Sequence, residues 1–132
     1  MLLGAVQDYR RRMHELSFAE QVVESVQREA AKYPGYAVTR VRLRAGELLA
    51  IEPASLRFCL EAISVGTVME NAAIEMTESA AALDCSNCGR VPIESLLNPH
   101  CPKCGKPGQV VGADLIIEEI ELDDNGQARG KD

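Results

Sequence analysis

The sequence predicts an α+β protein, in which a small three-stranded sheet carries two helices on one face and a zinc-ribbon lobe of four cysteines protrudes from it. Two stretches have apolar residues at helical spacing, three alternate as strands do, and two CxxC pairs stand between the second and third strands. The predicted order is therefore helix, strand, helix, strand, zinc ribbon, strand. With 132 residues, 46% of them hydrophobic, the chain can bury one core and support a small metal-held lobe.

The two predicted helices follow from apolar spacing and from their start and stop signals. The first covers residues 16–31 and must end by Pro34, which removes a backbone donor. The second begins at Pro53, which suits a first helical turn, and runs to about Ser64, with Gly66 beyond its end. The expected buried stripes are Leu16, Ala19, Val22, Val23, Val26 and Ala30 in the first helix, and Leu56, Cys59, Leu60 and Ile63 in the second.

Strand-like alternation predicts three strands, at residues 38–45, 73–79 and 114–122. In the first, three arginines occupy one face. Such a row could recognise phosphate or an acidic partner, but we favour a solvated face paired with glutamates of a neighbouring strand. The expected faces are Thr39, Val41, Leu43 and Ala45 against Arg40, Arg42 and Arg44 in the first strand, Ile74 and Met76 against Glu75 and Thr77 in the second, and Ile116, Ile120 and Leu122 against Leu115 and Ile117 in the third.

The zinc-ribbon prediction rests on two CxxC pairs, each followed by a glycine that lets the backbone turn with positive φ. Four thiolates complete a tetrahedral sulfur site with no open position, so bound Zn(II) would be structural and would help to fold the lobe. Two disulfides in a secreted protein are the alternative for the same spacing. The expected zinc ligands are Cys85, Cys88, Cys101 and Cys104.

Composition narrows the function classes. No stretch resembles a signal peptide or reaches membrane-spanning length, so we expect a cytoplasmic protein without a membrane role, in a reducing compartment that favours zinc over disulfides. The formal net charge of -6 argues against nucleic-acid binding. Cys59 lies far from both pairs and is expected to be a small buried hydrophobe. No nucleophile, base and orienting group come together in the sequence, so we do not expect an enzyme.

Several short motifs together resemble one known family. Met13-His14-Glu15-Leu16-Ser17, Gly46-Glu47-Leu48 with Glu52-Pro53, the paired CxxC motifs and the closing acidic and apolar strand occur in the order seen in the HypA/HybF family of nickel metallochaperones. The likeness spans about residues 13–122. It implies a protein that binds Ni(II) as cargo and delivers it, with the GTPase partner HypB, to the large subunit of [NiFe]-hydrogenase, and in some organisms to urease.

The resemblance also implies a nickel site at the amino terminus of the family's chains. Carried over, His14 would supply its imidazole and amide nitrogen, Glu15 an amide nitrogen or its carboxylate, and Met13 a terminal amine if the chain starts there. Nickel(II) accepts such planar nitrogen sets. Glu52 falls where the family has an acidic residue near this site, although it could equally serve the start of the second helix. His100, beside Cys101, is either an additional ligand or a histidine that only supports the zinc loop.

The resemblance divides the chain into a leader at residues 1–12, a nickel-binding α/β domain at 13–80 and 109–123, a zinc-ribbon domain at 81–108 and a flexible tail at 124–132. No periodicity predicts an element in the leader, which could extend the first helix. Because twelve residues precede Met13, we expect either that translation starts at Met13 or that the leader blocks a terminal-amine site. The protein is expected to be a monomer or a homodimer.

Two other functions remain compatible with these residues. One is a zinc-ribbon module that binds nucleic acid or a transcription complex, although residues 84–108 contain no aromatic side chain and few fixed positive charges. The other is an adaptor that recruits the GTPase through the glutamate-rich last strand and the first helix, without a nickel site of its own.

Overall fold

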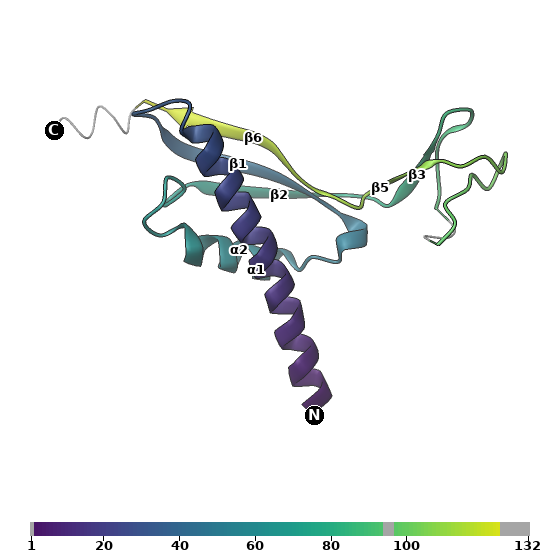
Figure 1. Cartoon of the computed structure of the whole chain (residues 1–132), viewed down its shortest axis with the longest axis horizontal. Helices are drawn as coiled ribbons and strands as arrows, with labels where there is room; N and C mark the ends of the chain where they lie inside the picture. Colours follow the sequence, from purple (N-terminus) through teal and green to yellow (C-terminus); the bar gives the residue numbers. More distant parts are fainter. Residues whose placement is uncertain (1, 94–96, 125–132) are drawn as a thin grey trace. The chain divides into compact units, whose positions relative to one another are not determined.

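The computed structural model describes residues 2–93 and 97–124 (Figure 1). Side chains are described from His14 onward. The flexible tail predicted at 124–132 therefore lies outside the described residues except for Asp124. Two main helices, a short 3-10 helix and six strands follow one another in this part of the chain. They are α1 (Leu2–Ala30), β1 (Ala37–Gly46), η1 (Glu47–Leu49), α2 (Pro53–Ser64), β2 (Ala73–Ser79), β3 (Ala82–Cys85), β4 (Gly89–Val91), β5 (Gln109–Val111) and β6 (Leu115–Asp123).

Helix α1 is longer than predicted, because it begins at Leu2 and continues without a break to Ala30. Residues 2–13 contain no proline and a single glycine, and most of them are good helix formers. The first part of the helix is therefore favoured by backbone propensity without a strong amphipathic pattern. As a consequence, His14 lies inside α1. The sequence had indicated a position just before the helix, so that prediction is wrong.

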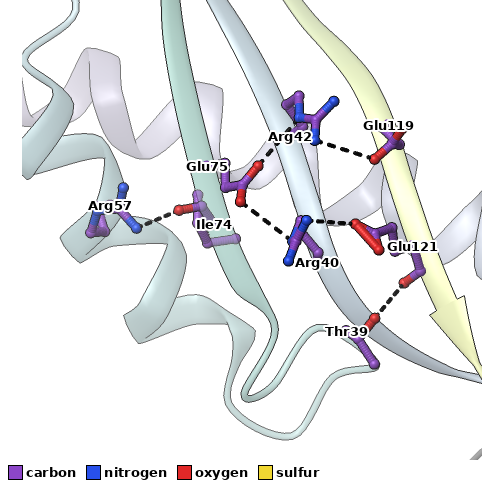
Figure 2. Close-up of polar contacts among 8 residues, drawn as sticks. All are labelled: Thr39, Arg40, Arg42, Arg57, Ile74, Glu75, Glu119 and Glu121. Carbon is purple, nitrogen blue, oxygen red and sulfur yellow. Dashed lines mark hydrogen bonds and ion pairs between the residues drawn. The ribbon is translucent and has the colours of Figure 1, made fainter.

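The predicted three-stranded sheet is confirmed, with the strand order β2-β1-β6. Strand β1 is the central strand, and its Arg40 and Arg42 pair with carboxylates on both neighbours (Figure 2). Arg40 contacts Glu75 of β2 at 3.4 Å and Glu121 of β6 at 3.0 Å, and Arg42 contacts Glu75 at 3.3 Å and Glu119 at 3.6 Å. This face therefore carries a cross-strand ladder of ion pairs. The favoured interpretation, in which the arginines pair with glutamates of a neighbouring strand, is confirmed for Arg40 and Arg42.

Two side chains depart from the predicted strand faces. Thr39 is exposed, and its hydroxyl donates to the carbonyl oxygen of Glu121 at 3.3 Å, while Val38 is buried instead. Ile116 is also exposed. Both lie toward the ends of their strands, where a strict period of two no longer describes which side chains are covered.

The chain forms two compact units, one from residues 1–43, 51–76 and 117–132 and the other from residues 44–50 and 77–116. In the first unit, α1 and α2 pack against each other, and apolar side chains of both helices and of β1 and β2 are buried. Burial confirms most of the predicted stripes, although Leu16, Cys59 and Ile63 are only half-buried. The buried apolar residues are Ala19, Val22, Val23, Val26, Ala30, Val38, Val41, Leu43, Leu56, Leu60, Met69 and Ile74.

The second unit contains a sheet that the sequence did not predict, with the antiparallel order β4-β3-β5. Leu83 of β3 lies opposite Val91 of β4 and Val110 of β5. These strands have only three or four residues, too few for alternation to be recognised. Leu83 and Val91 are buried together with Cys85 and Cys101, so the small core of this unit includes two of the predicted zinc ligands.

The Gly46-Glu47-Leu48 motif also belongs to this unit. The backbone N–H groups of Gly46 and Leu48 donate to the carbonyl oxygens of Asp114 and Gly112, each at 2.9 Å. Glu47 Oε1 accepts a hydrogen bond from the backbone N–H of Ala81 at 2.8 Å. The motif therefore connects distant parts of the unit through two of its backbone N–H groups and the Glu47 carboxylate. Among the residues that the structure describes, no helix is both long and apolar enough to cross a membrane.

Candidate metal centres

The four cysteines of the CxxC pairs come together in one cluster. Their sulfur atoms all lie within 4.8 Å of one another, and the Sγ atoms of Cys85 and Cys104 are 3.5 Å apart. Cys85 and Cys101 are buried, whereas Cys88 and Cys104 are half-buried. All four are free thiols, so the alternative of two disulfides is not what the structure contains.

Backbone N–H groups support the two CxxC turns in the same way. Cys85 accepts from the N–H groups two and three positions on, those of Asn87 and Cys88. Cys101 likewise accepts from Lys103 and Cys104, with the Lys103 nitrogen 3.4 Å from the sulfur. Each turn closes on a glycine with positive φ, 80° at Gly89 and 78° at Gly105, as the sequence predicted.

This backbone environment separates the pKa values of the thiols. The N–H groups of Cys88 and Asn87 lower the pKa of Cys85 to about 7. At Cys101 burial raises the pKa, but hydrogen bonds from the N–H groups of Cys104 and Lys103 and from the side chains of Cys104 and Cys88 together leave the pKa below its ordinary value. Burial, together with Cys101 and Cys104, raises the pKa of Cys88 to about 12. The first cysteine of each turn therefore ionises more readily than an ordinary thiol, and a bound dication would favour ionisation of Cys88.

The cluster fits structural zinc. A tetrahedral ion with Zn–S distances of about 2.3 Å places its sulfurs about 3.8 Å apart, close to the spacing found here. The N–H groups on Cys85 and Cys101 would stabilise thiolate charge after the ion had bound. Cys85, Cys88, Cys101 and Cys104 would then hold the zinc, which would supply cross-linking energy to a unit with a small core.

His100 is exposed and does not join the cysteine cluster. Its backbone N–H donates to the carbonyl oxygen of Asn98 at 2.8 Å, and it forms an isolated bridge with Pro107. In the second unit, His100 therefore helps to shape the loop beside Cys101 through its backbone and leaves its imidazole accessible.

The two side chains of the His14-Glu15 pair have opposite environments on α1. His14 is exposed, whereas only 1% of Glu15 is accessible to solvent. Glu15 Oε2 accepts a hydrogen bond of 2.7 Å from the backbone N–H of Glu52, and no partner is found for Oε1 among the described residues. The side chain of Met13 lies outside the described side chains.

Glu52 is the N-cap residue of α2. Its side chain is exposed and accepts a hydrogen bond from the backbone N–H of Ala54 at 3.0 Å, and Pro53 occupies the first helical turn. The structure thus brings Glu15 and Glu52 together through the Glu52 backbone, while the Glu52 carboxylate has the capping role that the sequence left as one alternative.

Sequence reasoning missed the burial of Glu15, although a signal for it was present. Glu15 precedes Ala19 by four residues and Val22 by seven, so helical spacing places it on the buried stripe of α1. A charged residue at such a position is rarely buried without a partner. The partner, a backbone N–H from α2, could not be identified from the sequence because it lies 37 residues away.

Comparison with known proteins places these features in a family. The family described as "Hydrogenase/urease nickel incorporation, metallochaperone, hypA" matches residues 13–122. A relative from Archaeoglobus fulgidus named "Hydrogenase maturation factor HypA" is 39% identical over 112 residues, which cover 84% of this chain and 99% of the relative. A relative of the same name from Geobacter sulfurreducens is 34% identical over 114 residues, covering 84% of this chain and all of the relative.

Solved structures agree on the fold. "Solution structure of the Ni metallochaperone HypA from Helicobacter pylori" superimposes with a TM-score of 0.62 at 20% identity, and covers 82% of this chain and 96% of that chain. A second HypA solution structure has a TM-score of 0.65 at 21% identity, with 85% and 98% coverage. The family match and the curated relatives together show that this chain belongs to the HypA family of nickel-incorporation metallochaperones, which are not enzymes.

Proposed function

We propose that this protein binds Ni(II) as cargo through a site at His14 and delivers it, with a HypB-type GTPase, to the large subunit of [NiFe]-hydrogenase, while the four-cysteine cluster holds structural zinc. The single observation that carries the proposal is the family match, which begins at Met13 and so includes the Met13-His14-Glu15 motif. Urease is a second client under the same proposal, and the cytoplasm is the location where both partners would be met.

His14 is the only histidine in the described part of the first unit, and its imidazole is exposed. The nickel-binding domain proposed at residues 13–80 and 109–123 would present it on α1, with Glu52 as a further candidate ligand. His100 is a separate candidate ligand in the second unit. A shallow, solvent-facing site suits a protein that has to release its cargo, because a closed cage would exchange metal slowly.

The helix limits how nickel could be bound. Inside α1 the backbone N–H groups of His14 and Glu15 point to carbonyl oxygens one turn earlier. A planar set that uses these amide nitrogens therefore requires α1 to open at this point, and the amine of Met13 is available only in a chain that starts there. With α1 intact, His14 would bind nickel through its imidazole and not through its amide nitrogen. The remaining ligands would be side chains such as Glu52.

The proposal is tested by nickel titration of the zinc-loaded protein, followed by calorimetry and by absorption. We expect His14→Ala to abolish the tight site and Glu20→Ala, an exposed glutamate on the same helix, to leave it unchanged. Unchanged affinity in His14→Ala would contradict the nickel site. If nickel delivery to hydrogenase also survived in both His14→Ala and His100→Ala, the adaptor function would be the better description.

A second titration compares chains that start at Met1 and at Met13. Tight binding with a planar-type absorption band only in the shorter chain would identify the terminal amine as a ligand. Equal binding in both chains would instead assign the site to the His14 imidazole and to side chains.

A further inference from the structure

The carboxylate of Glu15 is the unusual group in the first unit. It is 1% exposed, one oxygen accepts a 2.7 Å hydrogen bond from the Glu52 backbone N–H, and the other has no partner among the described residues. Burying a carboxylate with so few hydrogen bonds is costly compared with an apolar side chain of similar size. Its position therefore calls for an explanation other than stability.

The contact is made at the amino terminus of α2, where the helix dipole favours a negative charge. Two carboxylates serve this first turn: Glu52 caps the N–H of Ala54, and Glu15 takes the N–H of Glu52 itself. The carbonyl oxygen of Glu52 accepts from Leu56 at 3.0 Å, so Glu52 belongs to the hydrogen-bonded frame of α2. Through Glu15, that frame is joined to α1 one residue away from His14.

We propose that Glu15 is a positioning residue, whose carboxylate fixes α1 to the first turn of α2 and thereby holds His14 in place for nickel. This inference rests on the proposed function, because His14 has to be a nickel ligand for its placement to matter. It assigns Glu15 a role different from direct ligation, and it makes the Glu52 backbone N–H a functional group.

Accessibility distinguishes positioning from ligation by the carboxylate. Oε2 is already used by the Glu52 N–H, and the whole residue is shielded from solvent, so a hydrated cation reaches it only if α1 and α2 separate. His14, the next residue along the helix, is exposed. Residues that orient a metal ligand through hydrogen bonds commonly change metal affinity by about 10- to 100-fold when they are replaced.

Two substitutions separate the hydrogen bond from the charge. Glu15→Gln keeps an oxygen that can accept from the Glu52 N–H and removes the charge. Glu15→Met keeps the length and helix propensity of the side chain and removes the acceptor, without opening a large cavity. Glu20→Ala is the control on an exposed position of α1, and zinc content and thermal unfolding establish that each full-length variant is folded.

Two measurements are made on each zinc-loaded variant: nickel affinity, and hydrogen exchange of the Glu52 amide without nickel. We expect Glu15→Met to weaken nickel binding by about 10- to 100-fold and to speed exchange at Glu52. Glu15→Gln and Glu20→Ala should stay close to the parent in both measurements. This pattern supports positioning through the hydrogen bond.

Three results in the Glu15 variants would overturn the inference. In the first, Glu15→Gln and Glu15→Met lose nickel affinity equally while hydrogen exchange of the Glu52 amide is unchanged in Glu15→Gln. That result would identify the carboxylate as a nickel ligand. Faster exchange with unchanged nickel affinity in Glu15→Met would leave the contact purely structural. Unchanged exchange in Glu15→Met would show that the hydrogen bond does not hold α2. If His14→Ala binds nickel as the parent does, the nickel site itself fails and the positioning role with it, while faster exchange at Glu52 would still demonstrate the contact.

Discussion

The sulfur atoms of Cys85 and Cys104 lie 3.5 Å apart although the two cysteines come from different CxxC turns. The distance is short for two thiols in contact and close to that between two ligands of one tetrahedral ion. Because the same two turns supply the core cysteines Cys85 and Cys101, a metal ion bound to the cluster would stabilise the small core of the second unit, and the core would stabilise the metal site. Loss of the metal should therefore destabilise the core, and disruption of the core should weaken metal binding.

We expect Cys104→Ser to lose zinc and to unfold strands β3, β4 and β5. A hydroxyl is a poor zinc ligand, and a unit with few buried residues depends on the metal. Zinc content and amide exchange in residues 82–91 and 109–111 measure the effect. Cys59→Ser is the matched control because Cys59 is the fifth cysteine and lies outside the cluster. Full zinc content in Cys104→Ser would show that three thiolates suffice.

The ion-pair ladder predicts a stability that depends on salt. Arg42→Met should lower the thermal midpoint by a few degrees at most, because the arginine side chain is 38% exposed and surface ion pairs contribute little to stability. The difference from the parent should shrink in 1 M salt, where the Debye length falls to about 3 Å. A cycle with Glu75→Gln isolates the pairwise contribution. A difference that salt does not reduce would mean that Arg42 acts through packing of its side-chain stem.

Cys59 should react slowly with alkylating reagents at neutral pH. Burial first, and then the charge of Glu15, raise the pKa of this thiol above its ordinary value, and only the thiolate reacts. Because a raised thiol pKa means that the thiolate forms only as pH rises through that value, the rate should increase steeply under alkaline conditions.

The Glu15 contribution to this pKa can be tested directly. Glu15→Gln removes the negative charge, so the pKa of Cys59 should fall and the rate near pH 8 should rise in the zinc-loaded protein, where the other four thiols are protected. Alkylation followed by mass spectrometry gives the rate. Glu61→Gln, a change at an exposed position of α2, the helix that carries Cys59, should leave the alkylation rate unchanged. Identical rate profiles in the parent and Glu15→Gln would show that the carboxylate charge does not reach the thiol.

Gly46 should not tolerate a side chain. A Cβ atom at this position would lie 2.3 Å from the backbone carbonyl carbon and oxygen of Gly112, which cannot move away as a flexible side chain can. We expect Gly46→Ala to destabilise the protein by about 1–3 kcal/mol or more, the usual range for overpacking. Thermal or denaturant unfolding measures it, with Ala113→Ser as an exposed control nearby in the same unit. Parent-like stability would mean that the two segments can separate at little cost.

The glutamate-rich last strand illustrates how pairing changes an interpretation. From the sequence, the acidic side chains in the predicted strand at 114–122 were one candidate surface for recruiting the GTPase partner. In the structure, Glu119 and Glu121 pair with Arg42 and Arg40 of the neighbouring strand. Their charges are therefore partly neutralised within the sheet, and a partner that used them would have to compete with these arginines.

Local chemistry made part of this protein predictable. The bounds of α2 and β2 match the prediction, since Glu52 and Pro53 specify a helix start and the alternation in 73–79 specifies a strand without reference to the rest of the chain. The four-cysteine cluster was also predictable, because a CxxC turn brings two sulfurs together by backbone geometry over four residues.

Tertiary structure decided what depends on segments far apart in sequence. The short strands of the second unit have little propensity of their own and exist because they pair around Leu83 and the cysteine cluster. The environment of Glu15 depends on an N–H that belongs to another helix. The sequence alone determined which four cysteines come together in one cluster. Only the folded chain determined that Glu15 is buried beside an exposed His14, because burial is a property of the elements that pack together and not of the helix by itself.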